Sequence, residues 1–284
     1  MNLFRIRPLS AICVFIISTF LSGASYGQSA QEIVAKHIEA LGGKERLQSI
    51  NSVFIEGVAV MNNGTEIDTK LWKVYDRLYR QEISFGMGSV VTIVTPSRGW
   101  ISSPRSNGEF KSLPSAQLKA LQPQIDPAGP LADYAAKGCR VDLDGKDTVR
   151  GNPCYRIRLS CPMGQFVTYF IDMKTYYILK ETRKTGMMWG GDRLAGMTGR
   201  GETTAVMAGG ANAVGGAGAS TGAGVVGGET PTGDFSIEFS DYKKTADGYI
   251  FPYTIVTGIS GAKMNVERVE VNRKVDVDGL SRPR

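Results

Sequence analysis

The first strong pattern of apolar and polar positions in this chain is that of an amphipathic helix over residues 29–41. Apolar residues recur there every three or four positions, which places them on one face of a helix. Ser29 and Glu32 match a capping box, and the glycine pair at 42–43 is typical of a helix C-terminus. A second short helix is predicted over residues 44–49.

Beyond residue 50 the chain changes to runs rich in β-branched and aromatic residues, separated by turn signals such as Asn62-Asn63-Gly64. We expect ten to eleven strands in total. The runs cover 52–61, 65–75, 79–85, 90–95, 141–149, 154–160, 166–173, 177–183, 235–242, 249–257 and 263–271, and a turn at 96–99 precedes a short segment at 100–101.

Residues 112–137 interrupt the strands. Apolar residues keep helical spacing in two parts of this region, 118–125 and 131–135, and three prolines divide it into short helices. A strand-rich chain whose helices are confined to its N-terminus and its middle has the pattern of an α+β fold. We expect a large antiparallel sheet with helices packed on one face.

Several strands carry apolar or aromatic side chains at both odd and even positions, whereas a sheet with one solvated face should alternate. Two interpretations remain open. Helices cover one face while aromatic residues decorate the other, or the concave face of a curved sheet forms an apolar pocket for a lipid-like ligand. The candidate lining residues of such a pocket are Trp72, Val74, Trp100, Tyr169, Ile171 and Phe251.

Glycine is unevenly distributed. Of the 35 glycines among 284 residues, 16 lie between Gly186 and Gly233, without the triplet period of collagen. Such a segment has too few large apolar residues to form a core, so we interpret 186–233 as a flexible insertion between two strands. It is either a tolerated low-complexity insertion or a contact element for a partner.

Residues 1–27 have the features of an export signal. Arg5 and Arg7 precede an apolar run over 9–21, and small residues follow up to a cleavage site near Gly27. The apolar run is shorter than the ~20 residues that span a bilayer. We therefore expect a periplasmic protein with no transmembrane segment in its mature chain, residues 28–284, which form a single domain.

Export exposes the three remaining cysteines to oxidants. Cys154 and Cys161 are predicted on one strand, too far apart to bridge each other, so a disulfide would have to include Cys139. We favour Cys161 as its partner. Three reduced, buried cysteines are the alternative.

The sequence contains little that resembles catalytic machinery. The single histidine, His37, lies on the apolar stripe of the first helix and is interpreted as a core residue. Asp142, Asp144 and Asp147 lack the loop length of a calcium-binding EF-hand. A formal net charge of +6 without a Lys/Arg run does not indicate nucleic-acid binding. We expect a monomer that is not an enzyme, with no cofactor and no metal.

Three stretches together resemble the exported lipoprotein-sorting proteins of the LolA/LolB-like superfamily. They are the first helix with its glycine pair (31–43), Tyr169-Phe-Ile-Asp-Met-Lys-Thr-Tyr176, and Phe239-Ser-Asp-Tyr242 followed by Asp247-Gly-Tyr-Ile-Phe-Pro252. The resemblance covers about residues 30–275 apart from the glycine-rich insertion. It implies an incomplete antiparallel barrel whose concave side is plugged by helices, and no catalytic residues.

The resemblance also implies a ligand, since the sorting proteins hold lipid or lipoprotein acyl chains in an apolar cavity. This hypothesis predicts a contiguous apolar concavity with few buried charges. The same fold also serves as an envelope sensor or protein-interaction module with a protein partner, and fold alone does not decide between these functions. A filled interior would favour the second function.

Overall fold

The structure is a computed structural model that describes residues 28–86, 88–162, 165–184, 234–257 and 261–283. The predicted export signal and nearly all of the predicted glycine-rich insertion lie outside these residues, so both stay predictions.

Helices account for a small part of the described chain. The capping box predicted at Ser29 is present at the start of the first helix, where Glu32 and Ser29 bond each other's backbone N–H groups. The helical elements are α1 (Ala30–Ala40), α2 (Lys44–Gln48), η1 (Pro104–Ser106), α3 (Ser115–Leu121), η2 (Gln122–Ile125) and α5 (Val277–Leu280).

Thirteen strands form one antiparallel sheet in the described residues. They are β1 (Ser52–Val60), β2 (Glu66–Val74), β3 (Leu78–Phe85), β4 (Gly88–Val94), β5 (Gly99–Ser102), β6 (Lys111–Ser112), β7 (Arg140–Val149), β8 (Asn152–Cys161), β9 (Gln165–Asp172), β10 (Ile178–Lys184), β11 (Asp234–Lys244), β12 (Ile250–Thr257) and β13 (Lys263–Val271).

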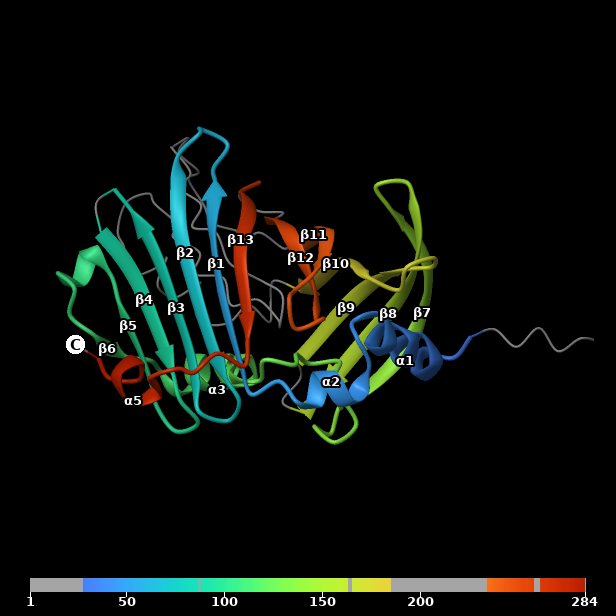
Figure 1. The fold of residues 1–284 in the computed structure, drawn as a ribbon, viewed down its shortest axis with the longest axis horizontal. Coiled ribbons are helices and arrows are strands. Elements are labelled where there is room, and N and C mark those ends of the chain that lie inside the picture. Colours follow the sequence, from blue (N-terminus) through green and yellow to red (C-terminus); the bar gives the residue numbers. More distant parts are fainter. Residues whose placement is uncertain (1–27, 87, 163–164, 185–233, 258–260, 284) are drawn as a thin grey trace, which may run out of the picture.

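The strand order explains the shape of the sheet. Neighbouring strands are consecutive in sequence except at the centre, where β1 pairs with β13 and joins the two halves of the chain. The sheet curves from β6 at one edge to β7 at the other without closing (Figure 1). The predicted α+β fold, an open curved antiparallel sheet with few helices, is confirmed.

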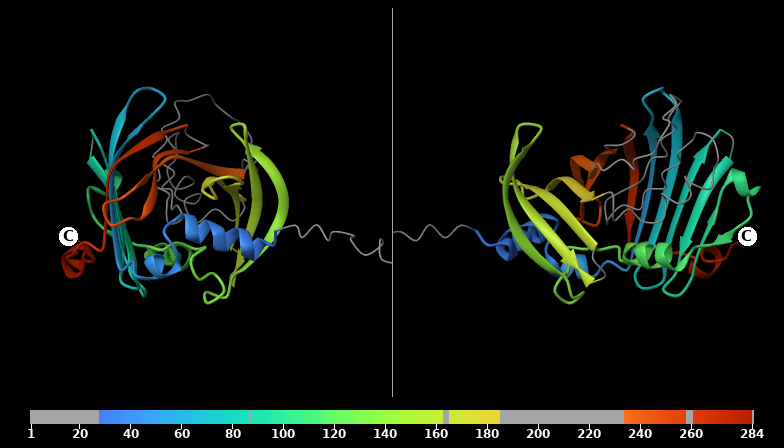
Figure 2. Two further views of the ribbon diagram at one scale, coloured as in Figure 1. Left: turned by 45° about the vertical axis from the view of Figure 1, so that its right-hand side comes forward. Right: turned by 180° about the vertical axis from the view of Figure 1, so that it is seen from behind.

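The helices lie on two sides of the sheet. In Figure 2, α1 and α3 lie between the two arms of the sheet, on its concave side, whereas α5 lies outside it. The main core cluster joins the apolar side of α1 to the inner face of the strands, from Ile67 and Ile83 in one arm to Ile157 in the other. Burial of this face is the main source of stability in a fold with so few helices.

Two expectations differ from the structure. Thirteen strands are present among the described residues instead of ten to eleven, partly because β5 and β6 are too short to give a periodic pattern. Residues 127–138 form turns and no helix, although Leu131, Tyr134 and Ala135 have helical spacing. Gly129, Asp133 and Gly138 all have positive φ there, which prevents a continuous helix.

Candidate functional site

The helix–sheet contact on the concave side contains a small cavity. It has a volume of about 30 Å³, room for about one or two water molecules. Its walls come from α1 and its C-cap residue Leu41, from residues 128–132, from strands β9 to β11, and from Tyr249, which directly precedes β12. Its lining includes Ile38, Leu41 and Leu131 as apolar residues and His37, Tyr169, Glu181 and Tyr249 as polar ones.

His37 connects α1 to the sheet. Its Nδ1 lies 2.8 Å from the carbonyl oxygen of Tyr176, in the turn between β9 and β10. Burial lowers the pKa of His37 to about 4, against the opposing effect of this hydrogen bond. The imidazole is therefore neutral near pH 7, with Nδ1–H as the donor and Nε2 as an acceptor. The structure agrees with the interpretation of His37 as a buried core residue.

Tyr169 and Glu181 add polar atoms to the same cavity. They are direct cross-strand partners in β9 and β10, and their exposed fractions are only 2% and 3%. Glu181 accepts from Arg183 at 3.1 Å, whereas the Tyr169 hydroxyl has no hydrogen-bond partner in the structure. Burial raises the pKa of Tyr169 above its ordinary range, so the hydroxyl keeps its proton and can donate.

A buried lysine lies on the same face of the sheet. Lys73 of β2 is 1% exposed, and its Nζ donates to Gln124 Oε1 of η2 at 3.4 Å. Burial lowers the pKa of Lys73 to about 8. The negative charge of Asp126 raises this pKa and so offsets only part of the effect of burial. The concave face is therefore not purely apolar, which differs from the expectation of few buried charges.

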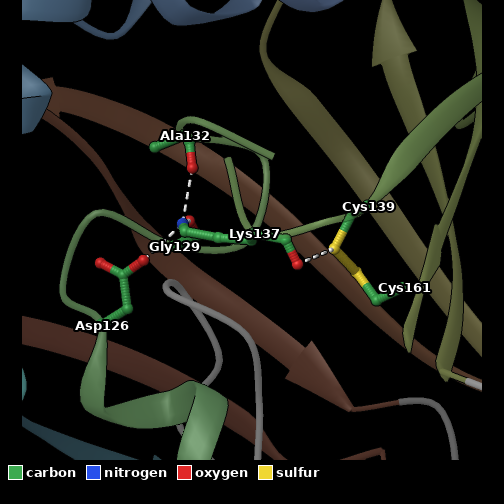
Figure 3. Close-up of a disulfide and its surroundings, with 6 residues drawn as sticks. All are labelled: Asp126, Gly129, Ala132, Lys137, Cys139 and Cys161. Carbon is green, nitrogen blue, oxygen red and sulfur yellow. Dashed lines mark hydrogen bonds and ion pairs between the residues drawn. A yellow bond between two sulfur atoms is a disulfide. The ribbon is translucent and has the colours of Figure 1, made fainter. Parts of the chain in front are cut away.

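Residues 126–139 form what we call the plug segment, and residues 128–132 of this segment line the cavity. Figure 3 shows the contacts of Lys137 and the disulfide at the end of the segment. Lys137 holds this segment together, because its Nζ donates to the carbonyls of Gly129 at 2.7 Å and Ala132 at 2.5 Å and pairs with Asp126. The end of the segment is fixed by a disulfide between Cys139 and Cys161. This is the favoured pairing, and Cys154 is a buried free thiol.

The six candidate lining residues do not share one face. Tyr169, Ile171 and Phe251 belong to the core cluster of the concave side. Trp72 and Val74 alternate with Lys73 and so point to the outer face, where Trp72 contacts Phe54 at a ring-centroid distance of 5.1 Å.

Trp100 is on the outer face too. Phe54, Trp72, Arg80, Ile93 and Trp100 are successive cross-strand partners, so they form one row across β1 to β5. Arg80 donates to the carbonyl oxygen of Leu280 at 2.8 Å, so α5 packs on this outer face. The structure therefore does not place all six residues around one cavity. The strand register assigns three of them to the concave face and three to the outer face.

Among the residues that line the cavity, Glu181 is the one acid, Tyr169 and Tyr249 carry hydroxyls, and His37 supplies a neutral imidazole. In the described part of the chain no three His, Cys, Asp or Glu side chains gather as metal ligands would. Within the same residues, no helix has the length and apolar character needed to span a bilayer. The site is a small cavity lined partly by hydrogen-bonding groups, next to a plug segment that is held by Lys137 and by a disulfide.

A curved antiparallel sheet with a plugged concave side is the architecture of LolA-like proteins, as the resemblance implies. No family model and no curated protein matches the sequence. Among solved structures, a DUF1329 family protein from Desulfovibrio piger matches with a TM-score of 0.50 and 9% identity, over 90% of this chain and 98% of the other.

Two further solved structures are similar in outline. A LolA superfamily protein from Nitrosomonas europaea has a TM-score of 0.49 and 11% identity, over 90% of this chain and 99% of that one. A domain described as an outer membrane lipoprotein-sorting protein, from Vibrio parahaemolyticus, has a TM-score of 0.46 and 10% identity. The match covers 89% of this chain and 98% of that one. At these identities the likeness concerns the fold alone.

Sequence reasoning missed most of the polar residues of the site. Glu181 and Lys73 belong to strands whose periodicity predicts which residues share a face, but nothing in the pattern marks either as buried. Lys137 lies at the end of the region that was expected to form short helices, and its contacts depend on turns that the spacing did not indicate. Gly129 and Gly138, which adopt positive φ in these turns, were the available sequence signal.

Proposed function

We propose that this chain is a non-enzymatic binding protein of the lipoprotein-sorting type, which holds lipid or lipoprotein acyl chains against the concave face of its sheet. We further propose that it is exported to the periplasm after cleavage near Gly27, and that it acts as a monomer. The fold supports the binding function, and the features of residues 1–27 support export to the periplasm.

The observation that carries the proposal is the largely apolar inner face, on which Lys73 and Glu181 are buried exceptions. It extends through both arms of the sheet, and short helices and the plug segment cover part of it. Each buried methylene of an acyl chain contributes ~0.8 kcal/mol, so a long chain can compete with such contacts. Because the cavity measures only about 30 Å³, binding requires the plug segment or α1 to move away from the sheet.

The direct test is native mass spectrometry of protein purified from the periplasm, together with binding of a fluorescent acyl probe. We expect co-purified lipid and saturable probe binding. Repeated recovery of lipid-free protein that binds no probe would reject the proposal.

Movement of the plug segment can be tested separately. Lys137→Met removes the contacts to Asp126, Gly129 and Ala132, so we expect faster hydrogen exchange over 126–138 and faster probe uptake. Lys146→Met, at an exposed position of β7, is the matched control and should change neither. If Lys137→Met speeds hydrogen exchange over 126–138 but leaves probe uptake unchanged, the acyl chain does not enter past the plug segment.

A second candidate function is an envelope sensor or protein-interaction module. The filled interior favours it, since the cavity is small and the concave face carries two buried charged residues, Lys73 and Glu181. If residues 186–233 are the contact element, deleting 187–232 should abolish cross-linking to a protein partner in cells and leave the thermal midpoint nearly unchanged. Loss of the fold on deletion would reject that version.

A further inference from the structure

Lys73 is a buried cation that the proposed function does not yet use. It is 1% exposed on the concave face, and among the described residues its Nζ has one hydrogen-bond partner, Gln124 Oε1 at 3.4 Å. An ammonium group has three protons to donate, and burying it without an ion-pair partner is unfavourable. Buried ionisable groups of this kind cluster at functional sites.

The charges around Lys73 leave it without an ion pair in the described part of the chain. Asp126 and Glu181 favour its protonated form, and Arg183 opposes it. Each of the two carboxylates pairs with another cation. Glu181 lies 3.1 Å from Arg183, and Asp126 pairs with Lys137. Lys73 is therefore the cation of this group that is balanced only at longer range.

The charge that balances Lys73 best is not on the sheet. Among the nearby charges, that of Asp126 does most to raise the pKa of Lys73, and Asp126 is the first residue of the plug segment. The hydrogen-bond partner Gln124 lies in η2, which runs directly into the same segment. Both partners of Lys73 thus belong to the part of the chain that covers the sheet.

Opening of the plug segment changes these surroundings. Lys73 is not among the residues that line the closed cavity, so a ligand reaches it only when the plug segment and η2 move away from the sheet. Lys73 then loses Gln124 and Asp126, whereas Glu181 and Arg183 stay on β10. The opened face presents two cations and one carboxylate, so one positive charge is in excess.

We propose that the open form binds the anionic end of a lipid-like ligand, a carboxylate or a phosphate, at Lys73. The anion replaces Asp126 as the balancing charge, and the ammonium group donates to its oxygens. The alkyl chain lies along the apolar inner face, to which Ile67 and Leu71 of the same strand contribute. The inference rests on the proposed acyl-binding function and specifies its ligand class.

The test compares three ligands with the same twelve-carbon chain: dodecanoate, dodecyl phosphate and dodecanol. Each displaces the fluorescent acyl probe from the mature protein at pH 7, where both acids are ionised and Lys73 is largely protonated. The measured quantity is the affinity for each anion divided by the affinity for dodecanol, because the contributions of the alkyl chain and of opening cancel in this ratio. We expect Lys73→Met to lower the ratio about ten-fold, the effect of one charge-assisted hydrogen bond.

Two further variants sharpen the test. Lys70→Met is the matched control, because Lys70 lies on the same strand at an exposed position of the outer face, and the ratio should not change. Asp126→Asn keeps an oxygen to accept from the Ala128 N–H and removes the charge that competes with the ligand, so it should raise the ratio. It keeps the proposal testable if Lys73→Met folds poorly.

The outcomes separate this proposal from the acyl-binding function. If the probe binds but the ratio is the same in the wild type, Lys73→Met and Asp126→Asn, the anionic subsite is wrong and acyl binding stands. An equal fall in Lys70→Met would mean that net charge attracts the anion without a site at Lys73. Acetate or inorganic phosphate that inhibits dodecanoate binding at equally low concentration, in the wild type but not in Lys73→Met, would show a site for a free anion instead of a lipid. If no ligand and no probe binds, the acyl-binding function itself fails, and the subsite with it.

Discussion

Lys73 is buried on the concave face although its side chain favours water. Its pKa of about 8, below the ordinary 10.5, means that the folded protein resists the charge that the unfolded chain accepts. The penalty is therefore largest below pH 8 and disappears as the pH rises toward 10.5. At neutral pH this shift corresponds to about 3 kcal/mol of lost stability.

Lys73→Met should therefore stabilise the protein. After allowance for the lost bond to Gln124, we expect the free energy of unfolding at pH 7 to rise by about 2 kcal/mol. The gain should shrink at alkaline pH, because neutral lysine carries no penalty. Urea denaturation at pH 7 and pH 10 measures both effects, and a variant destabilised at pH 7 would show that Lys73 is needed to hold η2.

His37 gives a second test of the same sign as Lys73, in the acid pH range. Its pKa is about 4 in the folded protein and 6.5 ordinarily, so folding favours the neutral ring. The stability due to the neutral ring is complete above pH 6.5 and is lost as the pH falls toward 4. Between pH 7 and pH 5 the loss is about 2 kcal/mol.

The His37 contribution can be isolated by substitution. His37→Asn keeps a polar group near the Tyr176 carbonyl but cannot titrate. Chemical denaturation across this pH range should show a smaller fall in stability for the variant than for the wild type. Equal slopes for the two proteins would mean that His37 is not buried in solution as it is in the structure.

The hairpin of β7 and β8 is where the disulfide acts. Cys139 and Cys161 are 22 residues apart in sequence and join the end of the plug segment to the end of β8. A cross-link over a loop of this length stabilises a protein by about 3 kcal/mol, because it restricts the unfolded chain. We expect Cys139→Ser with Cys161→Ser to lower the free energy of unfolding by about that amount.

Reducing agent supplies the control for the disulfide. It should destabilise the wild type and a Cys154→Ala variant alike, since Cys154 is a free thiol, and should leave the double serine variant unchanged. Sensitivity to reductant in the double variant would contradict this pairing.

The elements differ in how far the sequence predicts them. The capping box of α1 and the turn at 62–64 depend on adjacent residues, so local patterns are enough. The face on which Trp72 and Trp100 lie depends on register across five strands and on which face the helices cover. That information is not local, and the prediction of one shared cavity fails there.

The candidate site was predictable only in part. Tyr169, Ile171 and Phe251 are apolar or aromatic residues on strands that pack beneath α1, and the strand pattern selects them. Glu181 is buried with Arg183, two positions along the same strand, and Lys73 is buried with Gln124 of η2, which is distant in sequence. Burial of a charge is decided by its three-dimensional partners, so periodicity alone does not reveal it.

At the scale of the whole molecule, the feature to test is the long connection between β10 and β11, residues 185–233. Lys184 and Asp234 are direct antiparallel partners, so the two strands need only a short turn to join them. Replacing residues 185–233 with Asn-Gly shortens the loop by between four and five doublings. Closing the shorter loop is easier by about 3 kcal/mol, so the free energy of unfolding should stay the same or rise by up to that amount.

Urea denaturation and circular dichroism would measure that change, and the acyl probe would then separate the two candidate functions in the same variant. If acyl chains bind to the concave face formed by the described strands, the shortened protein keeps probe binding. If the inserted segment is the contact element for a protein partner, cross-linking to that partner is lost while the fold remains. A shortened chain that no longer unfolds cooperatively would mean that residues 185–233 contribute to the core, contrary to their composition.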